Sequence, residues 1–153
     1  MGDGFVFGTY GSGSGGKACA AVIPGTIDRP AQMAYEFDEA IPYVPLPVID
    51  GDRMYLLLDS GMLSLADVES GELVYDRERL SDGRSSKWFS SPVLAGDKLV
   101  CCSHGGDVVM VKAGDSFEVV GRSNVGELIN ACPAVVGDRL ILRTERKLLC
   151  VGE

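Results

Sequence analysis

The sequence predicts an all-β protein made of consecutive four-stranded antiparallel sheets, and two observations support this. The first is a repeat: among the Gly-Asp pairs of the chain, those at positions 2, 51, 96 and 137 are each followed by a short apolar run and lie 49, 45 and 41 residues apart. At the last three positions the pair sits in a longer pattern, Pro-x-x-x-Gly-Asp-[Arg/Lys]-[Leu/Met]. The second is a series of short apolar runs between turn residues, without a helical period. A repeat of about 40–50 residues with such contents is typical of the blades of a β-propeller.

The second repeat shows how one blade is built. Turn residues at 50–52, 59–61 and 67–72 divide it into four apolar segments. Pro45 and Pro47 in the first segment suit an inner or edge strand that begins irregularly. Four short strands joined by tight turns make one antiparallel sheet. We therefore expect strands over 43–49, 53–58 and 62–66 and a fourth that opens at 73–75.

The other repeats follow the same order. We expect strands over 91–94, 98–102, 107–112 and 117–121 in the third repeat and over 131–136, 139–143 and 147–151 in the fourth. The first repeat lacks the strand before its Gly-Asp turn and is expected to hold strands over 5–10, 17–23 and 32–37. The predicted units are a partial blade 1–40, a blade 41–86, a blade 87–127 and a partial blade 128–153.

The central strands are apolar at successive residues rather than at alternate ones, as in the runs 56–58, 99–102 and 140–142. Neighbouring side chains of a strand point to opposite faces, so both faces of these sheets are expected to be buried. Since no segment has helical periodicity, other sheets must cover them, as in blades packed face to face.

Composition excludes several classes of protein. Hydrophobic residues make up 46% of the 153, which is ample for a core. The net charge of -8, with no basic stripe, argues against nucleic-acid binding. No apolar run approaches the ~18–20 residues of a membrane span, and the first residues lack the basic and apolar regions of a secretory signal. Five cysteines are too few for a disulfide scaffold, and because the number is odd at least one must be free or paired with another chain.

The segment Asp67-Val68-Glu69-Ser70-Gly71-Glu72-Leu73-Val74-Tyr75 resembles the signature of pyrroloquinoline quinone (PQQ)-like propeller repeats, Asp-x-x-[Thr/Ser]-Gly-Glu-x-x-Trp, with Tyr75 in place of Trp. The Gly-Asp pattern before it is similar to that family as well. The resemblance covers the chain from about residue 43 to the end, and only the second repeat carries the Gly-Glu signature well.

The resemblance implies a function for the fold. The family includes quinoprotein alcohol dehydrogenases, the propeller lipoprotein of outer-membrane β-barrel assembly and many secreted bacterial proteins. It implies an extracytoplasmic location, and most members without the full enzyme motifs are not expected to bind the quinone. A quinone site in this family needs a stacking Trp and a calcium-binding cluster, whereas this chain has one Trp and no such cluster that we can place.

The predicted ring is incomplete, with two full blades between two partial ones. Propellers usually close with about 4–8 blades. We expect the chain to be the C-terminal part of a longer propeller, or to associate with a second copy into one ring of about eight sheets. In either case the end sheets of an isolated chain would expose apolar faces.

Two features of the third repeat invite a chemical interpretation. Adjacent cysteines are used against the quinone by dehydrogenases that resemble this family, but Cys101 and Cys102 lie within a predicted strand. Strand neighbours point to opposite faces, so buried free thiols are the preferred interpretation. His104, the sole histidine, lies in a predicted hairpin turn without partners for a metal or a catalytic triad.

Other segments have a structural interpretation that is preferred over a chemical one. The run Ser12-Gly13-Ser14-Gly15-Gly16 is a weak match to a phosphate loop and suits a long hairpin loop. Glu36, Asp38 and Glu39 form an acidic cluster that suits a solvated turn. The mixed charges Arg77, Glu78, Arg79, Asp82, Arg84 and Lys87 suit an exposed strand edge and loop. Trp88 and Phe89 are expected at a seam between blades, or else at an interaction surface.

No residue is therefore predicted to be catalytic, to bind a cofactor or to bind a metal. The sequence predicts a non-catalytic propeller segment that acts as a scaffold or protein-interaction module, with a protein partner or a second copy. The alternative is a fragment of a PQQ-dependent alcohol dehydrogenase, with PQQ and calcium as cofactors. The pairing of Cys19, Cys101, Cys102, Cys132 and Cys150 is left open.

Overall fold

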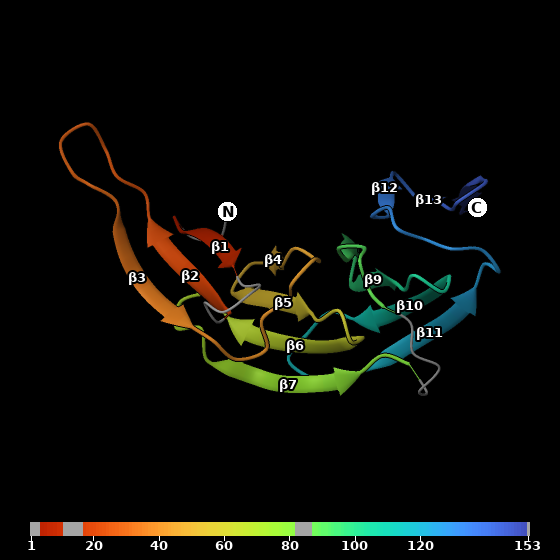
Figure 1. Ribbon diagram of the computed structural model, residues 1–153, viewed down its shortest axis with the longest axis horizontal. Coiled ribbons are helices and arrows are strands. Elements are labelled where there is room, and N and C mark those ends of the chain that lie inside the picture. The colour runs from red at the N-terminus through yellow and green to blue at the C-terminus, as the bar shows by residue number, and fades with distance from the viewer. Residues whose placement is uncertain (1–3, 11–16, 82–86, 153) are drawn as a thin grey trace.

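The computed structural model describes residues 4–10, 17–81 and 87–152, and among these there is no helix. Fourteen strands form four antiparallel sheets, and in each sheet the strands lie side by side in chain order. The sheets follow one another along an arc from the first at the left of Figure 1 to the fourth at its upper right. This confirms the predicted fold class, an open all-β arrangement of propeller type.

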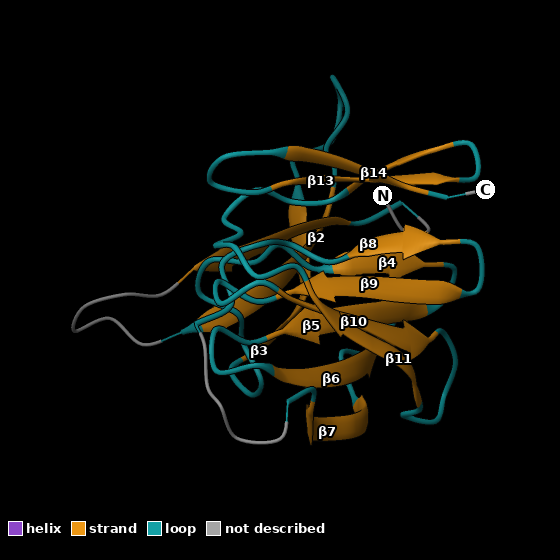
Figure 2. Cartoon of the chain, turned by 90° about the vertical axis from the view of Figure 1, so that its right-hand side faces the viewer, coloured by secondary structure: helices purple, strands orange, loops and turns teal. Residues whose placement is uncertain are grey.

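The first and last sheets have three described strands and the middle two have four. Sheet 1 holds β1 (Val6–Tyr10), β2 (Ala18–Ile23) and β3 (Gln32–Phe37), and sheet 2 holds β4 (Val48–Asp50), β5 (Arg53–Leu57), β6 (Met62–Asp67) and β7 (Leu73–Arg79). Sheet 3 holds β8 (Val93–Ala95), β9 (Lys98–Cys102), β10 (Asp107–Lys112) and β11 (Val119–Asn124), and sheet 4 holds β12 (Ala134–Val136), β13 (Arg139–Arg143) and β14 (Leu148–Val151). In Figure 2, β13 and β14 of sheet 4 lie above the strands of sheets 2 and 3.

The inner strands β4, β8 and β12 are shorter than the sequence predicted. The expected strand over 43–49 was wrong in its first half, because only residues from Val48 onward pair with β5. Pro45 and Pro47 have no N–H to give to a ladder. The amides of Tyr43 and Val44 instead donate to Oδ1 of Asp59, at 3.2 and 3.1 Å. Residues 43–47 thus form a loop tied to the turn that joins β5 and β6.

The repeated Gly-Asp pair is a turn with the same backbone geometry each time. The φ angles of Gly51, Gly96 and Gly137 are 59°, 60° and 62°, in the left-handed region that glycine adopts without a steric cost. Each glycine lies in the tight turn between the first and second strands of its sheet. The recurrence of glycine therefore follows from one hairpin used three times.

The core lies in the three seams where neighbouring sheets pack face to face. In β5, Met54 and Leu56 belong to the apolar cluster shared with sheet 1, and Tyr55 and Leu57 to the one shared with sheet 3. All four side chains are fully buried, which confirms that successive apolar residues mean two covered faces. A third cluster joins sheets 3 and 4 and is centred on Val100, Cys102, Val108, Ile129 and Leu142.

Candidate interaction surfaces

The adjacent cysteines of β9 lie in two different seams. Cys101 packs in the cluster between sheets 2 and 3, whereas Cys102 packs in the cluster between sheets 3 and 4. Both are buried, and neither forms a disulfide. The other three cysteines, Cys19, Cys132 and Cys150, are free thiols as well. Burial raises the pKa of the Cys102 thiol to about 12, with a smaller contribution from Cys132. Since the thiolate is the reactive form, burial keeps this thiol unreactive at neutral pH.

His104 has a structural environment in the turn between β9 and β10. Its ring Nδ1 lies 2.8 Å from Oδ1 of Asn130, and its ring packs 5.5 Å from that of Phe89. Its backbone amide donates to the carbonyl of Lys87 at 2.7 Å. His104 thus connects the segments before and after sheet 3, and among the described residues it belongs to no group of His, Cys, Asp or Glu that could hold a metal ion.

The acidic residues Glu36, Asp38 and Glu39 are exposed at and after the end of β3. Within the described ranges, no group of three or more His, Cys, Asp or Glu side chains could hold a metal ion. Of the mixed charges, Arg77, Glu78 and Arg79 lie on the outer edge strand β7, which fits the expected edge. The loop Ser12–Gly16 and the charges Asp82 and Arg84 lie outside the described residues.

Trp88 lies at the seam between sheets 2 and 3, as the preferred interpretation predicted. It is fully buried and packs with Tyr55, Leu80 and Cys101 among others. Its backbone amide donates to the carbonyl of Asp59 at 3.0 Å, and the amide of Leu80 donates to the carbonyl of Gly61 at 3.0 Å. These two backbone bonds fix the loop between sheets 2 and 3 against the turn that joins β5 to β6.

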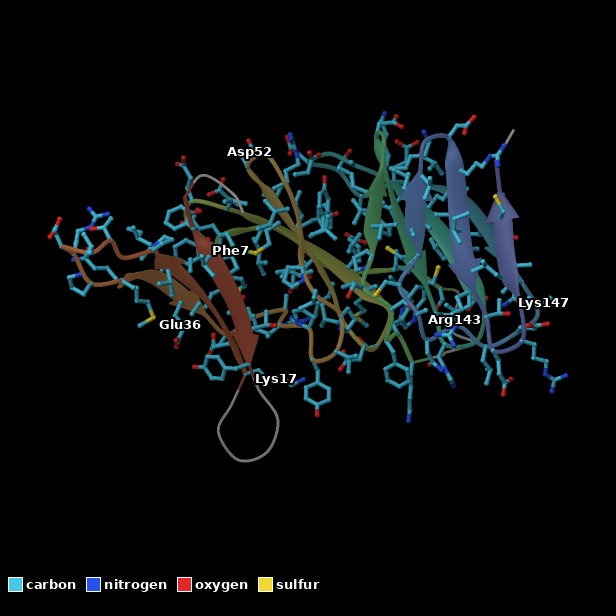
Figure 3. All side chains as sticks on the ribbon, turned by 90° about the horizontal axis from the view of Figure 1, so that it is seen from above. Phe7, Lys17, Glu36, Asp52, Arg143 and Lys147 are labelled. Atoms are coloured by element: carbon cyan, nitrogen blue, oxygen red, sulfur yellow. The ribbon has the colours of Figure 1, made fainter. Side chains whose placement is uncertain are left out.

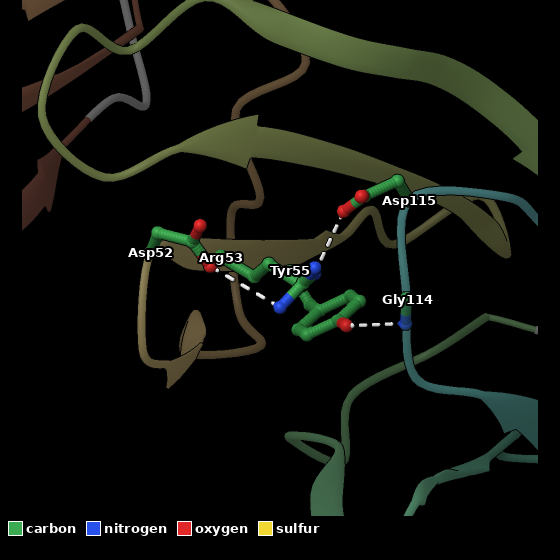
Figure 4. A network of polar contacts seen from close by, with 5 residues as sticks. All are labelled: Asp52, Arg53, Tyr55, Gly114 and Asp115. Atoms are coloured by element: carbon green, nitrogen blue, oxygen red, sulfur yellow. Dashed lines mark hydrogen bonds and ion pairs between the residues drawn. The ribbon is translucent and has the colours of Figure 1, made fainter.

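A polar network that the sequence analysis missed closes the same seam at its other end (Figure 4). Nε of Arg53 lies 2.8 Å from Oδ1 of Asp115, in the loop between β10 and β11. The backbone amide of Gly114 donates to the hydroxyl of Tyr55 at 2.9 Å. Arg53 also contacts its neighbour Asp52 at 3.2 Å. The loop of sheet 3 thus reaches over to sheet 2, which nothing in the repeat pattern indicates.

The seam between sheets 3 and 4 is less well filled. It contains a cavity of about 470 Å³ whose apolar wall includes Val100, Met110, Leu140 and Val151. The strand register explains the space: the position of Tyr55 in sheet 2 corresponds to Val100 in sheet 3, and that of Tyr75 corresponds to Gly121. Tyr55 and Tyr75 fill the seam between sheets 2 and 3. In the seam between sheets 3 and 4 the corresponding positions hold Val100, which is smaller, and Gly121, which has no side chain.

The two end sheets each leave one face uncovered. On sheet 1 this face carries Val6, Tyr10 and Met33, which are 47%, 53% and 63% exposed. On sheet 4 it carries Val136 and Leu148, which are 62% and 72% exposed. Exposed apolar patches of this kind typically mark protein–protein contact surfaces.

Charge also distinguishes the two uncovered faces. Glu36 lies opposite Ala20 on the open face of sheet 1, whereas Arg139 and Arg143 lie on the open face of sheet 4. Figure 3 shows Glu36 and Arg143 toward opposite ends of the molecule. The end faces are therefore apolar surfaces of opposite local charge, which is the complementarity that a head-to-tail contact requires.

The comparisons with known proteins bear on the fold alone. No protein-family model matches the sequence, and no curated protein matches it. BamB from Moraxella catarrhalis aligns with a TM-score of 0.73 and 16% identity over 97% of this chain and 43% of its own. The computationally designed Ika4 protein aligns with a TM-score of 0.73 and 8% identity over 98% of this chain and 86% of its own. The designed Ika8 protein aligns with a TM-score of 0.62 and 9% identity over 95% and 45%.

These structural likenesses agree with the propeller-type repeat fold. The chain spans less than half the length of BamB and of Ika8, but most of the length of Ika4. The described residues form no helix, and therefore none that is long and apolar enough to cross a membrane.

Proposed function

We propose that this chain is a non-catalytic propeller segment that acts as a protein scaffold, with its two uncovered end faces as association surfaces. The observation that carries the proposal is the exposure of apolar side chains on the open faces of both end sheets, whereas the central strands of the middle sheets are buried on both faces. Among the described residues, no group of three or more His, Cys, Asp or Glu side chains could hold a metal ion, and Cys19, Cys101 and Cys102 are buried free thiols. By the resemblance of its repeat we expect it to work outside the cytoplasm, without bound quinone.

A second copy of the chain is the partner that we propose for these faces. The open face of sheet 4 would pack on the open face of sheet 1 of the other copy, so that two arcs of four sheets close one ring of eight. Arg143 and Glu36 then approach each other across the new seam. The edges and faces that a ring protects are those that each chain exposes alone.

Light scattering behind size exclusion tests this arrangement. The chain has a mass of 16.2 kDa, so we expect a species of twice that mass at micromolar concentration. Replacing Leu148 by Asp puts a charge into the proposed seam and should convert the dimer to monomer or aggregate. Val120→Asp, an exposed valine on β11 away from both end faces, is the matched control and should keep the dimer.

The dehydrogenase alternative makes a separate prediction. Titration with PQQ and calcium should give no saturable change in absorbance or in the fluorescence of Trp88. A stoichiometric change would replace the scaffold proposal by a quinone-binding one.

A further inference from the structure

The five cysteines of the chain lie in different parts of the fold, with the exception of one pair. Cys19 packs between sheets 1 and 2, and Cys101 packs between sheets 2 and 3. Cys150 is exposed on the open face of sheet 4. Cys102 packs in the seam between sheets 3 and 4, and Cys132 lies in the segment that leads from sheet 3 into β12. Cys102 and Cys132 are therefore the two thiols that share a seam.

The position of Cys132 has a counterpart in each of the two preceding repeats, directly before the repeated proline. The amide of Leu46 donates to Oγ of Ser91 at 2.9 Å, and the amide of Ser91 donates to Sγ of Cys132 at 3.2 Å. In both seams the side chain at this position thus reaches back to the preceding sheet. The thiol of Cys132 is therefore turned toward sheet 3, where Cys102 lies.

The start of β8 brings the two cysteines near each other. β8 and β9 pair with Val93 opposite Val100, and this register extended by two residues brings Ser91 beside Cys102. β8 and β12 also approach each other with Cα atoms within 8 Å. Burial is the main cause of the raised pKa of the Cys102 thiol and the charge of Cys132 is the second, as expected of neighbouring sulfurs. Ser91 thus has a cysteine of the same seam on either side.

The two thiols differ in their access to solvent. Cys132 is exposed, whereas Cys102 is fully buried. A reagent in solution therefore reaches Cys132 first, and Cys102 meets a sulfur only inside the seam. The hydroxyl of Ser90 donates to the carbonyl of Ala131 at 2.9 Å, which holds the segment that carries Cys132 against sheet 3.

We propose that Cys102 and Cys132 form a disulfide by exchange with an external disulfide of the glutathione type. The thiolate of Cys132 attacks one sulfur of the external disulfide, breaks its S–S bond and releases one thiol. The thiolate of Cys102 then attacks Sγ of Cys132 in the mixed disulfide and releases the second thiol. The two cysteines lose two protons and two electrons, and the external disulfide is reduced to two thiols. Because burial keeps the Cys102 thiol protonated, the second step is the slower one.

The bond fastens the seam that contains the cavity. It closes the chain between residues 102 and 132 and thereby restricts the unfolded state, so the oxidised chain should unfold at a higher urea concentration. In the well-filled seam between sheets 2 and 3 the counterparts are Leu57 and Ser91, which form no such bond. Disulfides persist outside the cytoplasm, which is the location that we propose for this chain. The bond lies within one chain and does not depend on the proposed self-association.

Mass spectrometry of the full chain identifies the bond. The reduced chain is incubated with oxidised glutathione at about pH 8.5, where an exposed thiol ionises readily. We expect the intact mass to fall by about 2 Da, the two hydrogens that two thiols lose on forming one disulfide. After free thiols are blocked with N-ethylmaleimide in urea, trypsin should release residues 99–112 joined to residues 123–139. Dithiothreitol should separate the two peptides and lower the urea midpoint again.

Serine variants assign the bond, because the peptide 99–112 contains both Cys101 and Cys102. Cys101→Ser removes the adjacent buried thiol and Cys150→Ser removes the other exposed thiol, and both matched controls should keep the cross-link. Cys102→Ser should leave glutathione attached to Cys132, and Cys132→Ser should abolish the reaction at this seam. Circular dichroism checks that each variant is folded, and Cys132→Ser changes an exposed residue that the core does not require.

Four results would overturn the proposal. They are an unchanged mass after oxidation, glutathione that stays on Cys132 of the unaltered chain, a cross-link that survives Cys102→Ser, or a bond between two chains, seen as a doubled mass on a non-reducing gel. Leu148→Asp tests the end-face proposal in reducing buffer, where this disulfide is absent. Failure of one proposal therefore leaves the other standing.

Discussion

Replacing Gly61 by alanine tests whether the seam between sheets 2 and 3 is packed as the structure shows. Gly61 has a φ of 78°, and a Cβ built on it would lie 2.2 Å from Nε1 of Trp88. Gly51→Ala is the matched control, because Gly51 has a φ of 59° and a Cβ there would meet no atom within 4 Å. The two substitutions therefore share the backbone strain and differ in the contact with the indole.

The strain of a left-handed conformation costs an L-residue about 1–2 kcal/mol, and this applies to both variants. Overpacking of a filled core adds about 1–3 kcal/mol, which applies to Gly61→Ala alone. We expect the free energy of unfolding to fall by about 2–5 kcal/mol for Gly61→Ala and by about 1–2 kcal/mol for Gly51→Ala.

Urea unfolding followed by tryptophan fluorescence measures both values, since Trp88 is the sole tryptophan and is fully buried in this seam. Trp88→Phe, followed by circular dichroism, completes a double-mutant cycle: the extra loss caused by Gly61→Ala should shrink when the smaller ring is present. Equal losses for the two glycine variants, or a loss that Trp88→Phe leaves unchanged, would refute this packing.

Three further predictions concern the described thiols and the polar network. Tyr55→Phe removes the acceptor of the Gly114 amide and should lower the free energy of unfolding by about 1–3 kcal/mol, measured by urea unfolding. Ellman's reagent should titrate two thiols, Cys132 and Cys150, in the native chain and all five in urea; a fast third thiol would contradict the buried seams. Burial raises the pKa of Cys102 from 9.0 to about 12, so its thiol favours folding fully below pH 9. That contribution is lost as the pH rises from 9 toward 12, and the urea midpoint should fall over this range; a constant midpoint would contradict it.

The repeat pattern predicted most of the strands because each is fixed by local chemistry. Gly51, Gly96 and Gly137 mark turns that need a positive φ, and apolar runs such as that of β5 mark strands covered on both faces. The first half of the strand expected over 43–49 failed because the turn acceptor Asp59 competes for amides that a ladder would otherwise use. That competition depends on a residue more than a dozen positions away.

The features of the seams could not be predicted in the same way. The contact of Trp88 with Gly61, the pairing of Arg53 with Asp115 and the cavity beside Val100 arise between sheets. The sequence indicates the cavity only once the register aligns Val100 with Tyr55. A difference in side-chain size between two repeats predicts a cavity only when the residues that face each position are known. The opposite charges of the two end faces likewise required the pairing of β2 with β3 and of β12 with β13.

The solution mass of the chain tests the scaffold proposal most directly. Light scattering behind size exclusion at micromolar concentration should give a single species of twice 16.2 kDa, which Leu148→Asp disrupts and Val120→Asp preserves. A monodisperse, stable monomer of 16.2 kDa would show that the uncovered faces of sheets 1 and 4 need no partner, and would contradict the proposal.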